Sequence, residues 1–146
     1  MTLNNNHYIP TTEHFKNLIR SIWQVEGFTS FHDEHIILKG IVEVIFNFSD
    51  GSPIAGTIGS KQHHLSNCFI NGFNTAPVTL QLPEQQKFFG VQLQPLAVKK
   101  IFGVPAGEFS DSVVDLTLLE TGFHSIWHQL AEQNSFDNRV AIFSNW

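Results

Sequence analysis

The spacing of apolar residues changes at Pro95, and this change constrains the fold more than any other feature of the sequence. Before Pro95, short runs of β-branched and aromatic residues are separated by Gly, Pro and Asn, which is typical of short antiparallel strands. After it, apolar residues recur every three or four positions, as on one face of a helix. The sequence therefore predicts the α+β class, with a small antiparallel β-barrel or sandwich followed by C-terminal helices. The predicted strands are residues 18–28, 41–48, 67–73, 78–82 and 87–94.

Two of these strands have informative patterns. Residues 41–48 are nearly continuous β-formers, as expected for a strand that is buried on both faces. Residues 18–28 alternate instead, and simple alternation places Ile19, Trp23 and Val25 on one face.

Three helices are predicted in the last third of the chain. The first begins with Pro95, which suits the first helical position, and ends at Gly103. The second covers residues 122–132, and the third follows Ser135, a favourable N-cap residue. The apolar positions of the third helix are Phe136, Val140, Phe143 and Trp146. We expect that helix to run to the last residue, because no stop signal follows its apolar positions.

The charge of the chain argues against nucleic-acid binding by this segment alone. The formal net charge is −5 at pH 7, and the 8 Lys and Arg residues are scattered along the sequence. Duplex DNA is bound mainly through Lys and Arg that neutralise phosphates. The single cysteine cannot form an internal disulfide, and neither a signal peptide nor an apolar run long enough to cross a bilayer is present. We predict a cytoplasmic protein.

Eight histidines make a metal site the first chemistry to test. His32 and His35 form the densest cluster, but the His-x-His pattern of metal-binding cupins is absent, so we interpret this segment as a solvated loop. His124 and His128 lie four positions apart on a predicted helix and could hold a metal between them. The general-base Glu of the zinc proteases is absent there, so we interpret the pair as a flank of the apolar stripe. We predict no catalytic metal and no cofactor.

Motifs of nucleophilic catalysis and phosphate binding are also absent. The sequence has no Gly-x-Ser-x-Gly elbow, and residues 56–61 have the wrong order of Gly, Lys and Ser or Thr for a phosphate-binding loop. We predict a turn-rich hairpin at residues 56–61. Cys68 has no adjacent activating charge and is predicted to be a small buried residue. The sequence therefore does not predict an enzyme.

Glu43 is the polar residue that needs an explanation, because it lies in the most hydrophobic predicted strand. A carboxylate in such a strand is costly unless it is paired or faces a cavity. Asn47 shares its face of the strand, and Arg20 and Trp23 come from the neighbouring predicted strand. Together Arg20, Trp23, Glu43 and Asn47 form a candidate ligand pocket. The structural alternative is that Glu43 pairs with Arg20 or Lys39 at a sheet edge.

Several segments resemble the N-terminal domains of a group of AraC-family transcription regulators. Residues 36–47 resemble the strand LPDG-x-VELIFN, and residues 69–78 resemble the segment F-x-G-x-x-T-x-P-V. Residues 89–95 and 101–111 are similar to GV-x-F-x-P and LFG-x-PA-x-EL-x-D. Residues 20–23 are similar to an earlier strand that ends in an aromatic residue. In this order the resemblance covers about residues 18–143.

The resemblance implies a cupin-like sensor domain whose helices lead to a DNA-binding domain and help it dimerise. On this interpretation residues 1–94 are the β-rich sensor part, and residues 95–146 are the helical linker and dimerisation part of the same domain. The expected partners are an unknown small-molecule effector, a second copy of the chain and, through a downstream helix-turn-helix domain absent from this sequence, DNA. Leu38 and Lys39 replace the Pro-Asp of the family pattern, and no binding residue carries over from it.

Two alternatives remain at this point. The first is a stand-alone cupin-like module that is an enzyme or binds a small molecule. In the enzyme case, His32 or His35 would hold a divalent metal together with Glu43. The second is a purely structural dimerisation domain with a filled barrel.

Overall fold

The structure, a computed structural model, describes residues 3–28, 32–36, 42–49, 54–58, 61–65, 67–71, 78–82, 85–103, 113–116 and 122–145. Its strands are β1 (Leu3–Tyr8), β2 (Ile19–Phe28), β3 (His32–Ile36), β4 (Val42–Asn47), β5 (Ile54–Ile58), β6 (Lys61–Leu65), β7 (Cys68–Asn71), β8 (Val78–Leu82), β9 (Gln85–Leu93) and β10 (Val113–Asp115). Its helices are α1 (Glu13–Lys16), α2 (Pro95–Phe102), α4 (Gly122–Ala131) and α5 (Phe136–Ser144).

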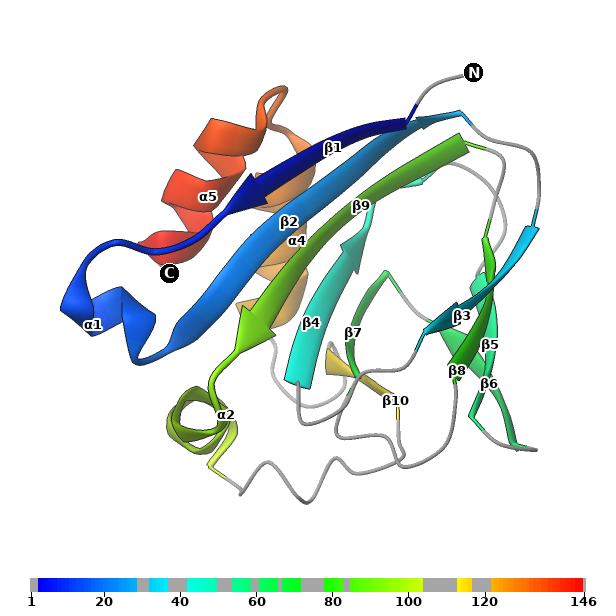
Figure 1. The fold of residues 1–146 in the computed structure, drawn as a ribbon, viewed down its shortest axis with the longest axis horizontal. Helices are drawn as coiled ribbons and strands as arrows, with labels where there is room; N and C mark the ends of the chain where they lie inside the picture. Colours follow the sequence, from blue (N-terminus) through cyan, green and yellow to red (C-terminus); the bar gives the residue numbers. More distant parts are fainter. Residues whose placement is uncertain are drawn as a thin grey trace.

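The strands form two antiparallel sheets. The larger sheet has six strands in the order β1-β2-β9-β4-β7-β10, and the smaller has four in the order β3-β8-β5-β6. Helices α4 and α5 cover one face of the larger sheet, and the smaller sheet lies on the far side of β4 and β7 from α5 (Figure 1). This arrangement confirms the predicted α+β class, with antiparallel sheets followed by C-terminal helices.

The helix-packed face of the larger sheet carries the main hydrophobic core. Phe46 of β4 is fully buried, and its ring lies 6.1 Å from the rings of Phe89 and Phe143. The other residues of this core include Ile22, Val44, Ile70, Val91, Phe123, Ile126, Leu130 and Val140. Every second residue of β4 and β9 therefore points toward the helices, and the residues between them face the opposite side.

The burial of β4 confirms the prediction of a strand covered on both faces. All of its residues from Val42 to Asn47 are buried, and it pairs with β9 on one side and β7 on the other. β4 is an interior strand, so Glu43 does not lie at a sheet edge, as the structural alternative required. Lys39, one of the two ion-pair partners considered for Glu43, lies outside the described residues. β2 is not the direct neighbour of β4, since β9 runs between the two.

A β-bulge changes the predicted faces of β2. The register of β2 against β9 shifts between Ile19 and Ser21. An extra residue reverses the alternation of side chains, so Ile19 joins the helix-packed core while Trp23 and Val25 face the other side. The prediction that Ile19 shares a face with Trp23 is therefore wrong, and Ser21 takes that place.

The segment of His32 and His35 is a strand, which corrects the predicted loop. β3 pairs with β8 in the smaller sheet, from His32 opposite Leu82 to Ile36 opposite Val78. Its sequence is polar, so backbone pairing with β8 overrides the weak strand propensity. The same holds for the Asn-rich β1, which pairs with β2 along its whole length. The hairpin predicted at residues 56–61 is confirmed by the pairing of β5 with β6.

Three predicted helix ends agree with the structure: both ends of α2 and the start of α5. Pro95 opens α2, and Gly103 ends it with a left-handed φ of 75° that favours glycine. The Ser135 side chain accepts a hydrogen bond from the backbone N–H of Asn138 and so caps α5. The prediction that the last helix runs to the final residue is wrong, since α5 ends at Ser144. None of the helices in the described ranges has the length and apolar character that crossing a bilayer requires.

Arg139 joins α5 to the sheet, a role that no sequence pattern predicted. Its side chain is 1% exposed. The guanidinium donates to the backbone carbonyl oxygens of Leu130 (2.9 Å) and Gln133 (2.8 Å) and to the side-chain oxygen of Gln24 on β2. It also lies 5.0 Å from the ring centre of Phe48, within cation–π range. One charged side chain therefore ties the end of α4, the start of α5 and β2 together.

We expect Arg139→Ala to lower the free energy of unfolding by about 3 kcal/mol, because three acceptors lose a charged donor and each such bond is worth roughly 1.5–3 kcal/mol without full additivity. Urea unfolding followed by circular dichroism measures the change. Arg139→Lys should recover little of the loss, because an ammonium group cannot copy the planar fork that reaches these acceptors.

The matched control is Lys100→Ala, which removes an exposed cation from α2. An exposed substitution of this kind should change stability by less than about 0.5 kcal/mol. Equal effects of the Arg139 and Lys100 variants would contradict the assigned role of Arg139.

Candidate functional site

A cluster of polar side chains lies on the face of the larger sheet opposite the helices, and we call it the polar face. Its members come from four neighbouring strands and are Ser21, Trp23, Glu43, Asn71 and Gln92. The register places Gln92 between Ser21 and Glu43, and Asn71 on the other side of Glu43. Ser21, Glu43 and Asn71 are each 4–5% exposed. A buried polar cluster in the middle of a sheet needs partners for its groups, and these define the site.

The Trp23 indole spans β9 to reach Glu43. Its Nε1 donates a hydrogen bond of 2.7 Å to Oε2 of Glu43. β2 and β4 are two strand spacings apart, about 10 Å, so only a long rigid side chain can make this contact. Gly90 lies under the ring, and a Cβ there would be 2.1 Å from Cε2 of Trp23. A glycine at position 90 is therefore required for the indole to cross the sheet.

A second line of hydrogen bonds reaches Glu43 along the same face. The Ser21 hydroxyl donates to Oε1 of Gln92 at 2.7 Å. Because that oxygen accepts from Ser21, the amide N–H₂ of Gln92 is left to donate to Glu43, with which Gln92 also hydrogen-bonds. The carboxyl of Glu43 is thus held by two donors: the Trp23 indole, which crosses over Gly90, and the amide of Gln92, the residue opposite Glu43 on β9.

Burial determines the protonation chemistry of Glu43. Removal from water raises the pKa of its carboxyl above the ordinary 4.5, and the hydrogen bonds from Trp23 and Gln92 offset part of the rise. Among the described residues, no cation forms an ion pair with Glu43. The ion pair within those residues joins Lys87 to Glu26 at 4.0 Å. A carboxyl of this kind can accept a hydrogen bond when ionised, donate one when protonated, or pair with a cation that enters the site.

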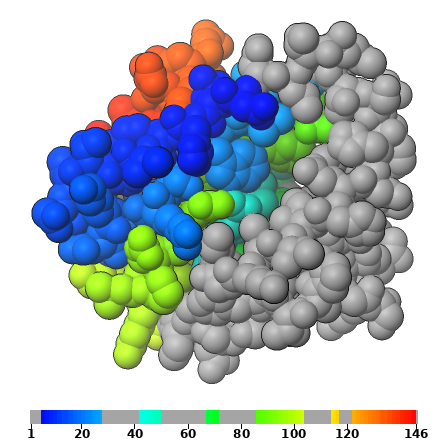
Figure 2. Space-filling model, in the orientation of Figure 1, coloured from blue at the N-terminus to red at the C-terminus, as the bar shows by residue number. Residues whose placement is uncertain are grey.

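A further buried polar side chain, Gln86, lies at the other end of β9. Gln86 is 3% exposed on the polar face, and its Nε2 has no hydrogen-bond partner in the part of the chain that the structure describes. An unpaired buried donor is costly, so a ligand or water that accepts from it is favoured. The space-filling view shows atoms of β2, β9 and β4 within a recess of this side of the molecule (Figure 2).

The structure brings two of the four candidate pocket residues into contact. Trp23 and Glu43 are hydrogen-bonded, whereas Arg20 is exposed beside the bulge of β2. Asn47 shares the face of Glu43, but its side-chain oxygen accepts from the backbone N–H of Ser49 at 2.9 Å. Its own backbone oxygen accepts from Nε1 of Trp127 at 3.0 Å, which joins β4 to α4.

Sequence reasoning missed Ser21, Gly90 and Gln92. The isolated glycine in the strand segment Phe-Phe-Gly-Val is a signal of close approach by another group, and it could have pointed to Gly90. Ser21 shares the face of Trp23 in simple alternation and in the structure, but a single serine in a strand is not a recognisable signal. Gln92 has no distinguishing pattern in the sequence, because its role depends on the pairing of β9 with both β2 and β4.

The other residues considered for catalysis do not form a site with Glu43 in the described ranges. Cys68 is fully buried on the helix-packed face, and burial together with the charge of Asp115 raises the pKa of its thiol. This confirms the prediction of a buried small residue. No group of three or more His, Cys, Asp or Glu side chains within those ranges is arranged to hold a metal ion. The side chains of His32 and His35 lie outside what the structure describes.

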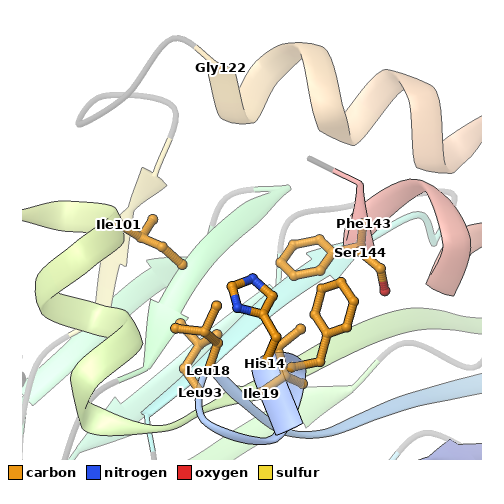
Figure 3. A pocket seen from close by; sticks show the side chains of 9 residues that line it. His14, Leu18, Ile19, Leu93, Ile101, Gly122, Phe143 and Ser144 are labelled. Carbon is orange, nitrogen blue, oxygen red and sulfur yellow. The ribbon is translucent and has the colours of Figure 1, made fainter. Parts of the chain in front are cut away.

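A separate pocket of about 600 Å³ lies at the helical side of the molecule (Figure 3). It is lined by His14, Phe15, Leu18, Ile19, Leu93, Ile101, Gly122, Phe143 and Ser144. The His14 imidazole lies among the apolar side chains of this lining (Figure 3). The lining includes none of the polar-face residues, so this pocket and the Glu43 cluster are different places in the fold.

We expect Gly90→Ala to break the contact between Trp23 and Glu43, because the added methyl group would occupy the position of the indole. The forced shift should cost roughly 1–3 kcal/mol of unfolding free energy, as overpacking usually does. Loss of the contact is measured by the shift of the Trp23 indole N–H signal in a ¹H–¹⁵N spectrum.

A double-mutant cycle separates this clash from a general effect of alanine in the strand. In a Trp23→Ala background the ring is gone, so Gly90→Ala should then cost little. If Gly90→Ala costs the same with and without the ring, the close approach of Trp23 is not the reason for glycine at this position.

No match is found among curated proteins. A weak structural likeness exists to a crystal structure described as ethanolamine utilization protein Q (EutQ) from Salmonella typhimurium LT2, with 7% sequence identity and a TM-score of 0.42. It covers 64% of this chain and 70% of that one, and it is too weak to carry an argument. Residues 7–115 match a family model, from within β1 to the end of β10. The chain therefore belongs to the family described as Domain of unknown function (DUF6597).

Proposed function

We propose that this chain is the effector-sensing and dimerisation domain of an AraC-type transcription regulator, in which a small molecule binds on the polar face beside Trp23 and Glu43. The proposal assigns no catalytic step to the domain. It takes the effector to be a small molecule with a hydrogen-bond donor or a positive charge that complements the Glu43 carboxyl.

The observation that carries the proposal is the buried Glu43 carboxyl, with hydrogen-bond donors on two sides and no cation paired with it in the described ranges. A fold that needed only a core would place an apolar residue in this interior strand, because a buried carboxyl is costly. Small-molecule sites typically combine an apolar lining with a few convergent polar groups. Ile45, Phe69 and Phe88 provide buried apolar surface on the same face.

The order of sequence segments supports the regulator part of the proposal. The segments that resemble AraC-type sensor domains begin within β2 and end at residue 111, and they include parts of the strands that build the polar face. The net charge of −5 fits a domain that leaves DNA contact to another part of the protein.

A direct route from the site to the helices also supports sensing. Glu43 and Asn47 belong to the same strand, and the backbone oxygen of Asn47 accepts the indole N–H of Trp127 on α4. Trp127 also contacts the ring of Phe48, at 5.6 Å between ring centres. A ligand that moves β4 at Glu43 would therefore change how α4 packs against β4. A sensor requires this kind of coupling between its ligand site and its helices.

The proposed output is dimerisation through the C-terminal helices and DNA binding by a downstream helix-turn-helix domain. Analytical ultracentrifugation of the purified chain measures the first part, and a homodimer is expected. The DNA-binding part is tested by sequencing the gene. The reading frame should continue past the codon for Trp146 with a basic, helix-turn-helix-like sequence. A stop codon directly after Trp146 would remove the DNA-binding output from the proposal.

The effector site is tested by screening fractionated metabolite pools for a rise in melting temperature. Because a ligand that binds only the folded state stabilises it by RT ln(1 + [L]/Kd), a ligand at 100 times its Kd should add about 2.7 kcal/mol. The active fraction should also change the fluorescence of Trp23 in a Trp127→Phe, Trp146→Phe background, where Trp23 is the remaining tryptophan, since its indole is hydrogen-bonded to the binding carboxyl.

Glu43→Gln should abolish both responses, because the amide cannot pair with a cation or offer two acceptor oxygens. The matched control is Glu132→Gln, which changes an exposed carboxyl just after α4 and should leave both responses intact. A ligand that stabilises wild type and Glu43→Gln equally would place the effector site elsewhere.

A further inference from the structure

Two exposed histidines face each other on α4, apart from the polar face and its proposed function. His124 and His128 are separated by one helical turn, and their Nε2 atoms lie 3.2 Å apart. The ring centres are 4.6 Å apart, with an interplanar angle of 84°. In the absence of a metal, one neutral ring donates its Nε2 hydrogen to the other, so only one of the two nitrogens can be the donor.

We propose that His124 and His128 form a two-imidazole binding site for a divalent transition-metal ion of the Zn²⁺ or Cu²⁺ type. The first argument is distance. An ion at the usual 2.0–2.1 Å from two nitrogens that are 3.2 Å apart subtends about 100–106° between them, close to the tetrahedral angle of about 109°. The side chains therefore need little movement to accept the ion.

The second argument is preorganisation. Both residues belong to the ten-residue helix α4, whose Phe123, Ile126 and Leu130 are buried against the sheet, so the backbone under the pair is fixed. The Trp127 ring lies 4.9 Å from the His128 ring at 87° and restricts its rotation. The neighbouring polar side chains on the helix, Gln129 and Ser125, are hydrogen-bonded to each other at 3.2 Å. Little side-chain entropy remains to be lost when the metal binds.

The third argument is chemical selectivity. Neutral imidazole is a preferred ligand for Zn²⁺, Cu²⁺ and Ni²⁺, whereas Mg²⁺ and Ca²⁺ prefer oxygen ligands. Both rings bind through Nε2 and carry their hydrogen on Nδ1, so the shared Nε2 hydrogen shifts to the Nδ1 tautomer. Two ligands leave further coordination positions for water, so the site holds an ion without enclosing it. The sequence-based interpretation of this pair as a flank of the apolar stripe agrees with its exposed position beside Phe123, Ile126 and Leu130, and the proposal adds a bound metal to that flank.

Thermal unfolding with ZnCl₂ tests the proposal on the whole chain. A metal that bridges one turn of α4 in the folded state should raise the melting temperature by about 5–10 °C at 100 times its Kd, and MgCl₂ should not. His124→Gln and His128→Gln should each weaken Zn²⁺ binding at least tenfold, since even outer-shell changes at metal sites cost about 10–100-fold. His14→Gln, an exposed histidine on α1, is the matched control and should keep the full shift.

Fluorescence provides a second readout that does not depend on stability. Cu²⁺ at the pair would lie close to the Trp127 ring and should quench it with one-to-one stoichiometry. Trp127→Phe should lose that quenching while it keeps the ZnCl₂ shift. The proposal is overturned if ZnCl₂ gives no shift, or if the shift is as large in His124→Gln and His128→Gln as in wild type, because the metal then binds at other histidines.

Discussion

The hydrogen bond from the Trp23 indole to Glu43 is the interaction that organises the polar face of the larger sheet. It joins two strands that are not neighbours, and it passes over β9 only because residue 90 has no side chain. The same bond makes a buried carboxyl tolerable in the most apolar strand of the protein. Three separate features of the sequence thus have one physical explanation: a glycine within β9, a tryptophan on the neighbouring β2 and a glutamate between valines on β4.

The two faces of that sheet have different roles. The helix-packed face contributes to a core of aliphatic and aromatic side chains with α4 and α5, fastened by the buried Arg139. The polar face contains hydrogen-bonded groups that a core does not need. Because β4 contributes to both faces, and Asn47 at its end holds Trp127 of α4, a change at Glu43 has a short path to the helices. This division of roles is the physical basis of the sensor proposal.

The sequence predicted what depends on local pattern and missed what depends on pairing. Periodicity predicted the strands of the larger sheet other than β1 and β10, and the structure confirms them. Cap chemistry predicted the start of α2, its Gly103 cap and the Ser135 cap of α5, which are also confirmed. β1 and β3 are polar and exist through their partners, so periodicity could not reveal them. The face of Ile19 was wrong because a single bulged residue reverses the alternation. Glu43 was identified as unusual from its apolar neighbours alone, but its bonds to Trp23 and Gln92 required β9 to be placed between β2 and β4.

The most direct test of this account follows the Trp23 indole N–H signal in ¹H–¹⁵N spectra as the pH is changed. If the indole donates to a buried Glu43 carboxyl, the signal should titrate with a midpoint above the ordinary carboxyl value of 4.5, because burial raises the pKa of that group. The titration should be absent in Glu43→Gln. A signal that does not titrate, or that titrates at or below 4.5, would show that Glu43 is not the buried, indole-bound carboxyl on which the proposed ligand site depends.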